Sequence, residues 1–101
     1  MSMADILAGD QRLVILRSLT EVPGYSLNEA VLKTGVRHFG HRIGQDIVRA
    51  HLEYLARHGL LAVEKIRAER GELWVATLTA MGEDVANGAA THVGVARRGA
   101  D

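Results

Sequence analysis

The sequence predicts a mainly α-helical domain that carries one β-hairpin before its last helix. Three observations support this class. Residues 45–58 place apolar side chains at helical spacing and end at Gly59. Two apolar runs then flank the short turn Glu69-Arg70-Gly71, which is typical of a hairpin. Turn residues divide the first 44 positions into two further helices, so the predicted order is three helices, a two-stranded hairpin and a fourth helix.

The first helix is predicted from Ala4 to about Val22. Ser2 and Asp5 form an S-x-x-D capping pattern at its start. Its centre is the run Leu13-Val14-Ile15-Leu16, which covers more than one helical face and therefore needs partners on two sides. The second partner is either the rest of this small domain or another copy of the chain. We expect a homodimer through this helix, with a possible contribution from the C-terminal segment.

The second helix is predicted from Leu27 to between Thr34 and Phe39. Pro23 ends the preceding helix, and Ser26-Leu27-Asn28-Glu29 matches the S-x-x-E capping box. The connection Gly40-His41-Arg42-Ile43-Gly44 follows, with two glycines and an apolar Ile43 that can enter the core. A helix, a short turn with glycine and an amphipathic helix are the parts of a helix-turn-helix.

The third helix separates an apolar arc from a charged one. Ile47, Val48, His51, Leu52 and Leu55 fall within roughly 140° at about 100° per residue. The opposite arc carries Asp46, Arg49, Glu53 and Arg57.

The predicted hairpin consists of residues 60–68 and 72–77, and a short fourth helix follows it. Thr79 is the expected N-cap of that helix, which continues to about Asn87 before Gly88 stops it. We therefore predict one domain over residues 1–88 and a flexible C-terminal tail over residues 89–101.

Composition limits the function classes. The 101 residues suit a single domain, and no apolar run approaches the roughly 20 residues of a membrane span. No signal peptide is evident and cysteine is absent, which fits a reducing cytoplasm. The formal net charge is zero, which counts against a tight, autonomous DNA binder because such domains are usually basic.

Two motifs carry a resemblance. Residues 51–61, HLEYLARHGLL, resemble the L-x-x-L-x-x-x-G-L-[LV] exit from the third helix of many bacterial winged helix-turn-helix regulators, and residues 78–82, LTAMG, resemble their L-T-x-x-G junction. The chain also resembles a small family of Mu-like phage and prophage proteins in its Ser-Leu-Asn-Glu start, its Phe-Gly-His turn and the segment from Trp74 to Gly88. The resemblance implies a phage-encoded winged helix similar to arsenic-repressor-type regulators.

The leading functional prediction is a prophage-encoded, dimeric transcriptional regulator that places its third helix in the major groove of duplex DNA. Gln45 and Arg49 have side chains suited to adenine and guanine edges, whereas arginine and lysine elsewhere can contact phosphate. The candidate DNA-binding residues are Lys33, Arg42, Gln45, Arg49, Arg57, Arg67 and Arg70. Arg97 and Arg98 could extend this footprint.

One alternative to DNA recognition remains. Arg49, Glu53 and Arg57 are spaced four residues apart, so this face could be a solvated, salt-bridged surface. The protein would then be a winged-helix interaction module in phage assembly or packaging that reads no bases.

Metal and enzyme chemistry find little support in the sequence. His38-x-x-His41 has no third ligand in view, and His51 and His58 are expected to pack or to cap their helix. No phosphate loop, G-x-S-x-G or H-E-x-x-H motif is present. Trp74 is expected in the core or in a dimer contact. We predict no catalytic activity, cofactor, metal or small-molecule ligand.

Overall fold

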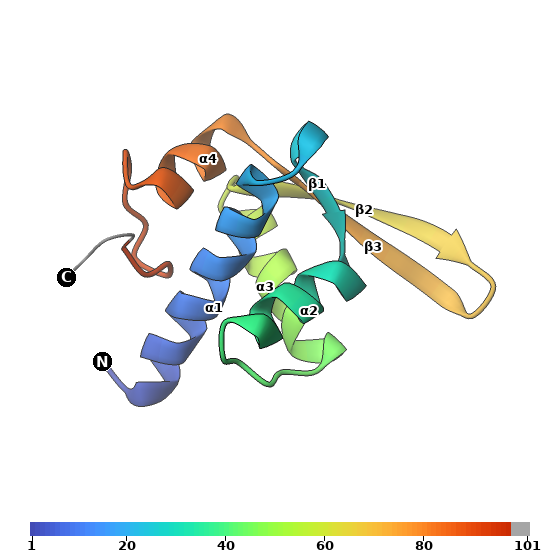
Figure 1. The fold of residues 1–101 in the computed structure, drawn as a ribbon, viewed down its shortest axis with the longest axis horizontal. Helices are drawn as coiled ribbons and strands as arrows, with labels where there is room; N and C mark the ends of the chain where they lie inside the picture. Colours follow the sequence, from blue (N-terminus) through green and yellow to red (C-terminus); the bar gives the residue numbers. More distant parts are fainter. Residues whose placement is uncertain (98–101) are drawn as a thin grey trace.

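The structure, a computed structural model, describes residues 1–97 and contains four helices and a three-stranded antiparallel sheet (Figure 1). This arrangement is compatible with a winged helix. In chain order the elements are α1 (Met3–Thr20), a 3-10 turn (Pro23–Tyr25), β1 (Ser26–Asn28), α2 (Glu29–His38), α3 (Gln45–Arg57), β2 (Leu61–Ala68), β3 (Gly71–Leu78) and α4 (Ala80–Asn87).

The predicted hairpin is confirmed, and its long strands dominate the shape of the molecule. β2 and β3 pair from Leu61↔Leu78 at the base to Ala68↔Gly71 at the tip. The hairpin extends well beyond the helices in Figure 1. β2 is exposed from Glu64 to Ala68 and β3 is exposed at Gly71 and Glu72, whereas Trp74 is buried. The hairpin therefore packs on the body from its base as far as Trp74.

The third strand, β1, was not predicted, and it corrects the expected start of α2. Ser26 pairs with Thr77 of β3, and its hydroxyl bonds to the Ala76 carbonyl and the Thr77 hydroxyl. The N-cap of α2 is instead Asn28, whose side chain accepts from two backbone N–H groups of the first turn. Asn is as good a cap as Ser, and the strand pairing engages Ser26 elsewhere. The Ser26 capping box is therefore wrong.

The other helix ends follow the sequence signals, except that α1, predicted to continue to about Val22, ends at Thr20. Ser2 and Asp5 form the expected capping box of α1. Thr79 caps α4 by accepting from the Gly82 N–H at 3.0 Å. The predicted stops after α3 and α4, Gly59 and Gly88, have φ angles of 74° and 83°, which glycine adopts without steric cost.

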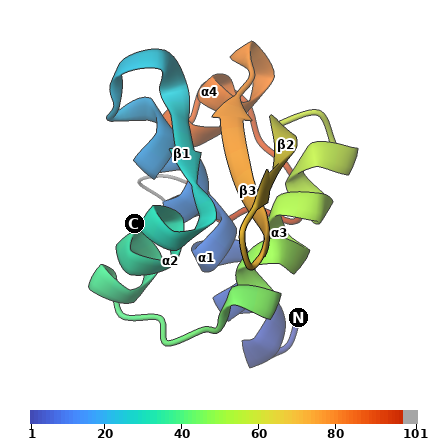
Figure 2. The same ribbon diagram turned by 90° about the vertical axis from the view of Figure 1, so that its right-hand side faces the viewer.

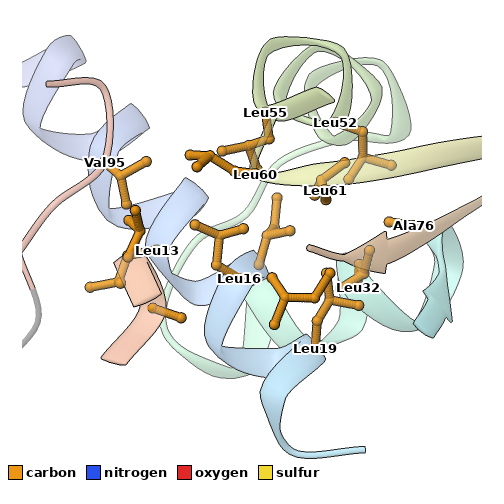
Figure 3. Close-up of a cluster of buried hydrophobic side chains, with 14 of the residues drawn as sticks. Leu13, Leu16, Leu19, Leu32, Leu52, Leu55, Leu60, Leu61, Ala76 and Val95 are labelled. Atoms are coloured by element: carbon orange, nitrogen blue, oxygen red, sulfur yellow. The ribbon is translucent and has the colours of Figure 1, made fainter. Parts of the chain in front are cut away.

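A single core joins α1 to the other helices and the sheet (Figure 3). Apolar side chains of α1 meet those of α2, α3 and the sheet in one cluster, which is largely sealed from solvent. The labelled members are Leu13, Leu16, Leu19, Leu32, Leu52, Leu55, Leu60, Leu61, Ala76 and Val95. Trp74, expected in the core or in a dimer contact, is buried in this cluster.

The inner arc of α3 is confirmed except at Ile47. Val48, His51, Leu52 and Leu55 are buried, whereas Ile47 is 40% exposed. Ile47 lies in the first turn of α3, where the connection from α2 leaves it uncovered.

Residues 89–97 pack on the body instead of extending from it as the predicted flexible tail. Val95 is buried in the core beside α1, and the Ala96 N–H donates to the Gly9 carbonyl at 3.1 Å. The last part of the predicted tail, including Arg98, lies outside the described residues.

Candidate nucleic-acid interface

The surface predicted to meet DNA combines α2, the turn over residues 39–44, α3 and the hairpin. Figure 2, viewed with the hairpin pointing toward the reader, shows α2 and α3 on opposite sides of it. The first turn of α3 is exposed at Gln45, Asp46 and Ile47. The helix therefore offers its N-terminal end to solvent on the side from which the hairpin projects.

Glu29 lies at the centre of this surface, yet it is only 2% exposed. Its carboxylate accepts four hydrogen bonds: from Arg49 Nε at 2.6 Å and Nη2 at 2.9 Å, from Gln45 Nε2 at 3.0 Å and from the Trp74 backbone N–H at 2.8 Å. The bonds from Arg49, aided by those from Trp74 and Gln45, lower the pKa of Glu29 to about 2 in spite of its burial. Glu29 thus joins α2, α3 and β3 through one ionised group.

The Arg49 side chain does not extend into solvent from the charged face of α3 as helical spacing predicts. Besides its two bonds to Glu29, its Nη2 donates to the Glu72 carbonyl at 2.9 Å. Its guanidinium carbon also lies 4.7 Å from the centre of the Trp74 ring. These contacts fix the guanidinium between α2 and the hairpin, and the bonds to Glu29 raise the pKa of Arg49 above its ordinary value.

Gln45 is exposed but also bonded to Glu29, so the two residues predicted to read bases are joined to the same carboxylate. The other five candidates have exposed side chains: Lys33 on α2, Arg42 in the turn, Arg57 at the end of α3, and Arg67 and Arg70 at the hairpin tip. Across residues 1–97, the ion pairs are Arg49–Glu29 and His41–Asp10. These five cations are therefore free to meet an anionic partner.

Formal charge is distributed unevenly along the chain. Residues 29–78, which form α2, α3 and the hairpin, carry eight Lys and Arg side chains against six Asp and Glu side chains. The net charge of this part is +2, so the remainder of the chain carries −2. The overall neutrality of the protein thus conceals a modest excess of positive charge on the candidate interface.

The histidines of the predicted H-x-x-H pair do not converge. His41 bonds through Nε2 to Asp10 at 2.6 Å and through Nδ1 to Gln11 at 3.3 Å, whereas His38 is exposed and packs against Phe39. His51 is buried and bonded to Gln11 and Arg12. Within the described part of the chain, no three His, Cys, Asp or Glu side chains are grouped as metal ligands.

The role of Glu29 in this surface could not be predicted from the sequence. Its position three residues after Ser26 predicts a capping role, and nothing local marks it as an acceptor for a side chain twenty positions later. The only available signal was its location beside a helix start whose first turn is otherwise apolar.

Comparison with known proteins gives a phage relationship. The chain is 42% identical over 93 residues to a protein of Escherichia phage Mu named uncharacterized protein gp26, and the match spans 92% of each chain. The chain belongs to the gp26 family. An uncharacterized protein of Haemophilus influenzae is 43% identical over 67 residues, which are 66% of this chain and 65% of that protein. No protein-family model matches the sequence.

Membership of the gp26 family confirms the predicted relationship to Mu-like phage proteins. The names of these gp26 relatives assign neither an activity nor a ligand. None of the described helices has the length and hydropathy needed to cross a membrane.

Proposed function

We propose that this phage-family protein is a winged helix that binds duplex DNA, with α3 as the recognition helix and the β2–β3 hairpin as the wing. The order of helices and strands supports this assignment, since β1 closes the small sheet on the far side of β3 from β2. A dimeric regulator of transcription is the biological role that fits such a module.

The observation that carries the proposal is the position of Arg49. Its guanidinium binds Glu29 of α2 and the Glu72 carbonyl of β3 at once, so α3 and the hairpin are held in one orientation. A fixed relation between a recognition helix and its wing allows both to meet DNA without a cost of ordering them. Arg49 is accordingly a positioning residue in this proposal.

Direct contacts then fall to the exposed side chains. Arg67 and Arg70 at the hairpin tip are placed to contact the phosphate backbone or a minor groove, and Lys33 and Arg42 to contact phosphate beside α3. Gln45 keeps a second amide N–H and its amide oxygen beside its bond to Glu29, so it can still contact a base edge. Phosphate contacts from the five exposed candidates would make binding strongly dependent on salt.

Dimerisation through α1 would strengthen such binding. Met3, Ile6 and Leu7 lie at i, i+3 and i+4 and are 67%, 48% and 43% exposed. An apolar stripe of this kind on a helix supports a second copy as its partner, and sedimentation of the wild type against Ile6→Glu tests this point.

The deciding experiment measures DNA affinity as a function of salt for the wild type, Arg67→Ala and Arg70→Ala. If each arginine contacts a phosphate, each substitution reduces the slope of log K against log salt by about 0.9. Arg17→Ala, an exposed cation on α1, is the matched control and leaves the slope unchanged. No binding by the wild type at low salt, across a library of phage promoter fragments, would overturn the proposal.

A protein-interaction module in phage assembly or packaging is the second candidate. The engagement of Arg49 by Glu29 and the Glu72 carbonyl favours it, because this engagement occupies the group of α3 best suited to read guanine. This candidate would be favoured if the wild-type protein does not bind DNA at low salt but co-sediments with a purified phage structural protein.

A further inference from the structure

Three rings gather between the end of α3 and the C-terminal segment, defined here as residues 92–96. The ring centres of Tyr54 and His58 lie 4.4 Å apart, and those of His58 and His92 lie 4.7 Å apart. The His92 ring also meets Tyr54 edge to face, with 5.9 Å between ring centres. His58 is exposed, whereas His92 is half-buried, so the fold shields His92 more than His58 from solvent.

The segment is attached to α1 by two hydrogen bonds and one buried side chain. Arg12 Nη1 donates to the Gly94 carbonyl at 2.9 Å, and the Ala96 N–H donates to the Gly9 carbonyl at 3.1 Å. The Val95 side chain, between these two bonds, is buried in the core. All three contacts depend on the backbone path that the segment takes after His92.

The imidazole of His92 holds the turn that sets this path. The Val95 N–H donates to the His92 carbonyl at 3.1 Å, and the Gly94 N–H donates to His92 Nδ1 at 3.0 Å. A backbone N–H can only donate, so Nδ1 offers a lone pair and the proton of the neutral ring is on Nε2. A second proton can add only to Nδ1, where it would face the Gly94 N–H. Protonation of His92 therefore excludes this hydrogen bond.

Across residues 1–97, no carboxylate forms an ion pair with His92, since the paired carboxylates are those of Asp10 and Glu29. The titratable and charged groups around the His92 ring are Tyr54 and His58 of α3, Arg12 of α1, and Arg97, which lines the same small pocket. α4 contributes only the apolar Val85 to that pocket. Burial, followed by the charges of His58 and Arg12, lowers the pKa of His92 below its ordinary value of 6.5.

We propose that His92 makes docking of the C-terminal segment sensitive to acid. The segment stays on α1 while the His92 ring is neutral. When the ring takes up a proton, the Gly94 N–H loses its acceptor, the turn opens, and Val95 is withdrawn from the core. Because a histidine whose pKa is lowered by docking is neutral in the docked state, docking is complete above pH 6.5 and weakens as the pH falls below that value.

The first test compares amide exchange of Ala96 at pH 8 and pH 5. The exchange rate is expressed as a protection factor, relative to the rate of an unstructured chain at the same pH, so that the pH dependence of the chemistry cancels. His92→Asn places an amide oxygen near the position of Nδ1, which can accept from the Gly94 N–H at either pH. His38→Asn, at an exposed histidine outside the ring cluster, is the matched control.

In the wild type and in His38→Asn, the Ala96 protection factor should fall roughly five- to tenfold between pH 8 and pH 5, about the effect of losing one hydrogen bond. In His92→Asn it should stay constant by comparison. His51, whose pKa is lowered to about 4 chiefly by burial, titrates over part of this range. It is present in all three proteins, so the difference between them belongs to His92. Equal losses in the wild type and in His92→Asn, or no loss in the wild type, would overturn the proposal.

The second test measures the pKa of His92 by NMR of its imidazole ring. A Cβ at Gly9 would lie 3.3 Å from the Ala96 nitrogen, so Gly9→Val should displace the segment, as faster Ala96 exchange would show. If docking requires the neutral ring, displacement should return the pKa of His92 to about 6.5. An undocked Gly9→Val segment with the wild-type pKa of His92 would contradict the proposal, and so would a pKa of 6.5 or above in the wild type itself. Failure of the wild type to bind DNA would remove the proposed function and leave both results standing.

Discussion

Arg49 and Glu29 form a two-bond ion pair, with donor–acceptor distances of 2.6 and 2.9 Å, between two helices whose sequence positions differ by twenty. The Glu29 side chain is almost fully buried, whereas about a quarter of the Arg49 side chain remains exposed. Because the pair also reaches β3 through Glu72 and Trp74, it stabilises the relation of α2, α3 and the hairpin rather than one helix.

Replacing Glu29 by glutamine should destabilise the protein by about 2–3 kcal/mol. The substitution leaves Arg49 and the Trp74 N–H with an uncharged partner that offers one acceptor oxygen. Loss of one member of a fully buried pair costs about 3–5 kcal/mol, and the partial exposure of Arg49 lowers that figure. Urea unfolding measures the change as a shift in midpoint.

Glu53→Gln is the matched control for this substitution. Glu53 is exposed on the same helix as Arg49, so its replacement should change the free energy of unfolding by less than about 0.5 kcal/mol. Equal midpoints for Glu29→Gln and Glu53→Gln would show that the pair adds nothing to stability.

The free energy of unfolding should fall in two steps as the solution is acidified. The pKa of His51 is near 6.5 in the unfolded chain and about 4 in the folded one, so the unfolded state takes up a proton first and stability declines between these values. The pKa of Glu29, 4.5 in the unfolded chain and about 2 in the folded one, adds a second decline in that lower range. Each step, once complete, should lower the free energy of unfolding by about 3 kcal/mol.

His51→Gln isolates the first step. The Gln amide can accept from Arg12 and donate to Gln11, as the neutral ring does, but it does not titrate. The variant should therefore lose much of the decline between pH 6.5 and 4 that urea unfolding detects in the wild type. An unchanged pH profile would mean that other groups cause the decline.

Local sequence patterns predicted the helices and the hairpin because those elements are stabilised by contacts within a few residues. The apolar spacing in α3, the Thr79 cap and the glycine at position 59 each act over at most one or two turns. Their physical causes are present in any short window of the chain.

The elements that escaped prediction depend on partners far along the chain. β1 is three residues long, and it exists because Ser26–Asn28 meets β3 about fifty positions later. The local sequence predicts that Glu29 caps a helix. In the structure Glu29 instead accepts hydrogen bonds from Arg49 and the Trp74 N–H. Position alone also misplaced the Arg49 side chain, because helical spacing gives the direction of Cβ but not where a long side chain ends.

Gly82 should be intolerant of even one added carbon. A Cβ at this position would lie 1.8 Å from the Leu60 carbonyl oxygen, because the first turn of α4 crosses directly over the start of β2. Gly82→Ala should thus cost more than about 3 kcal/mol or prevent folding, as measured by thermal unfolding followed by circular dichroism.

Gly59→Ala separates this steric effect from backbone conformation. Gly59 has a φ of +74°, but the space that a Cβ would occupy there is open, so alanine should cost only about 1–2 kcal/mol. A Gly82→Ala protein as stable as Gly59→Ala would show that α4 can shift away from β2.

The packing of residues 89–97 predicts that the C-terminal segment contributes to the stability of the whole domain. Val95 is 5% exposed and belongs to the core, whereas Val93, two residues earlier, is 96% exposed. Val95→Ala removes two buried methyl groups and should lower the free energy of unfolding by about 2 kcal/mol. Val93→Ala, the same chemical change on the same segment, should leave it unchanged. If both variants unfold at the wild-type urea midpoint, the segment does not stabilise the core, and the domain is complete at the end of α4.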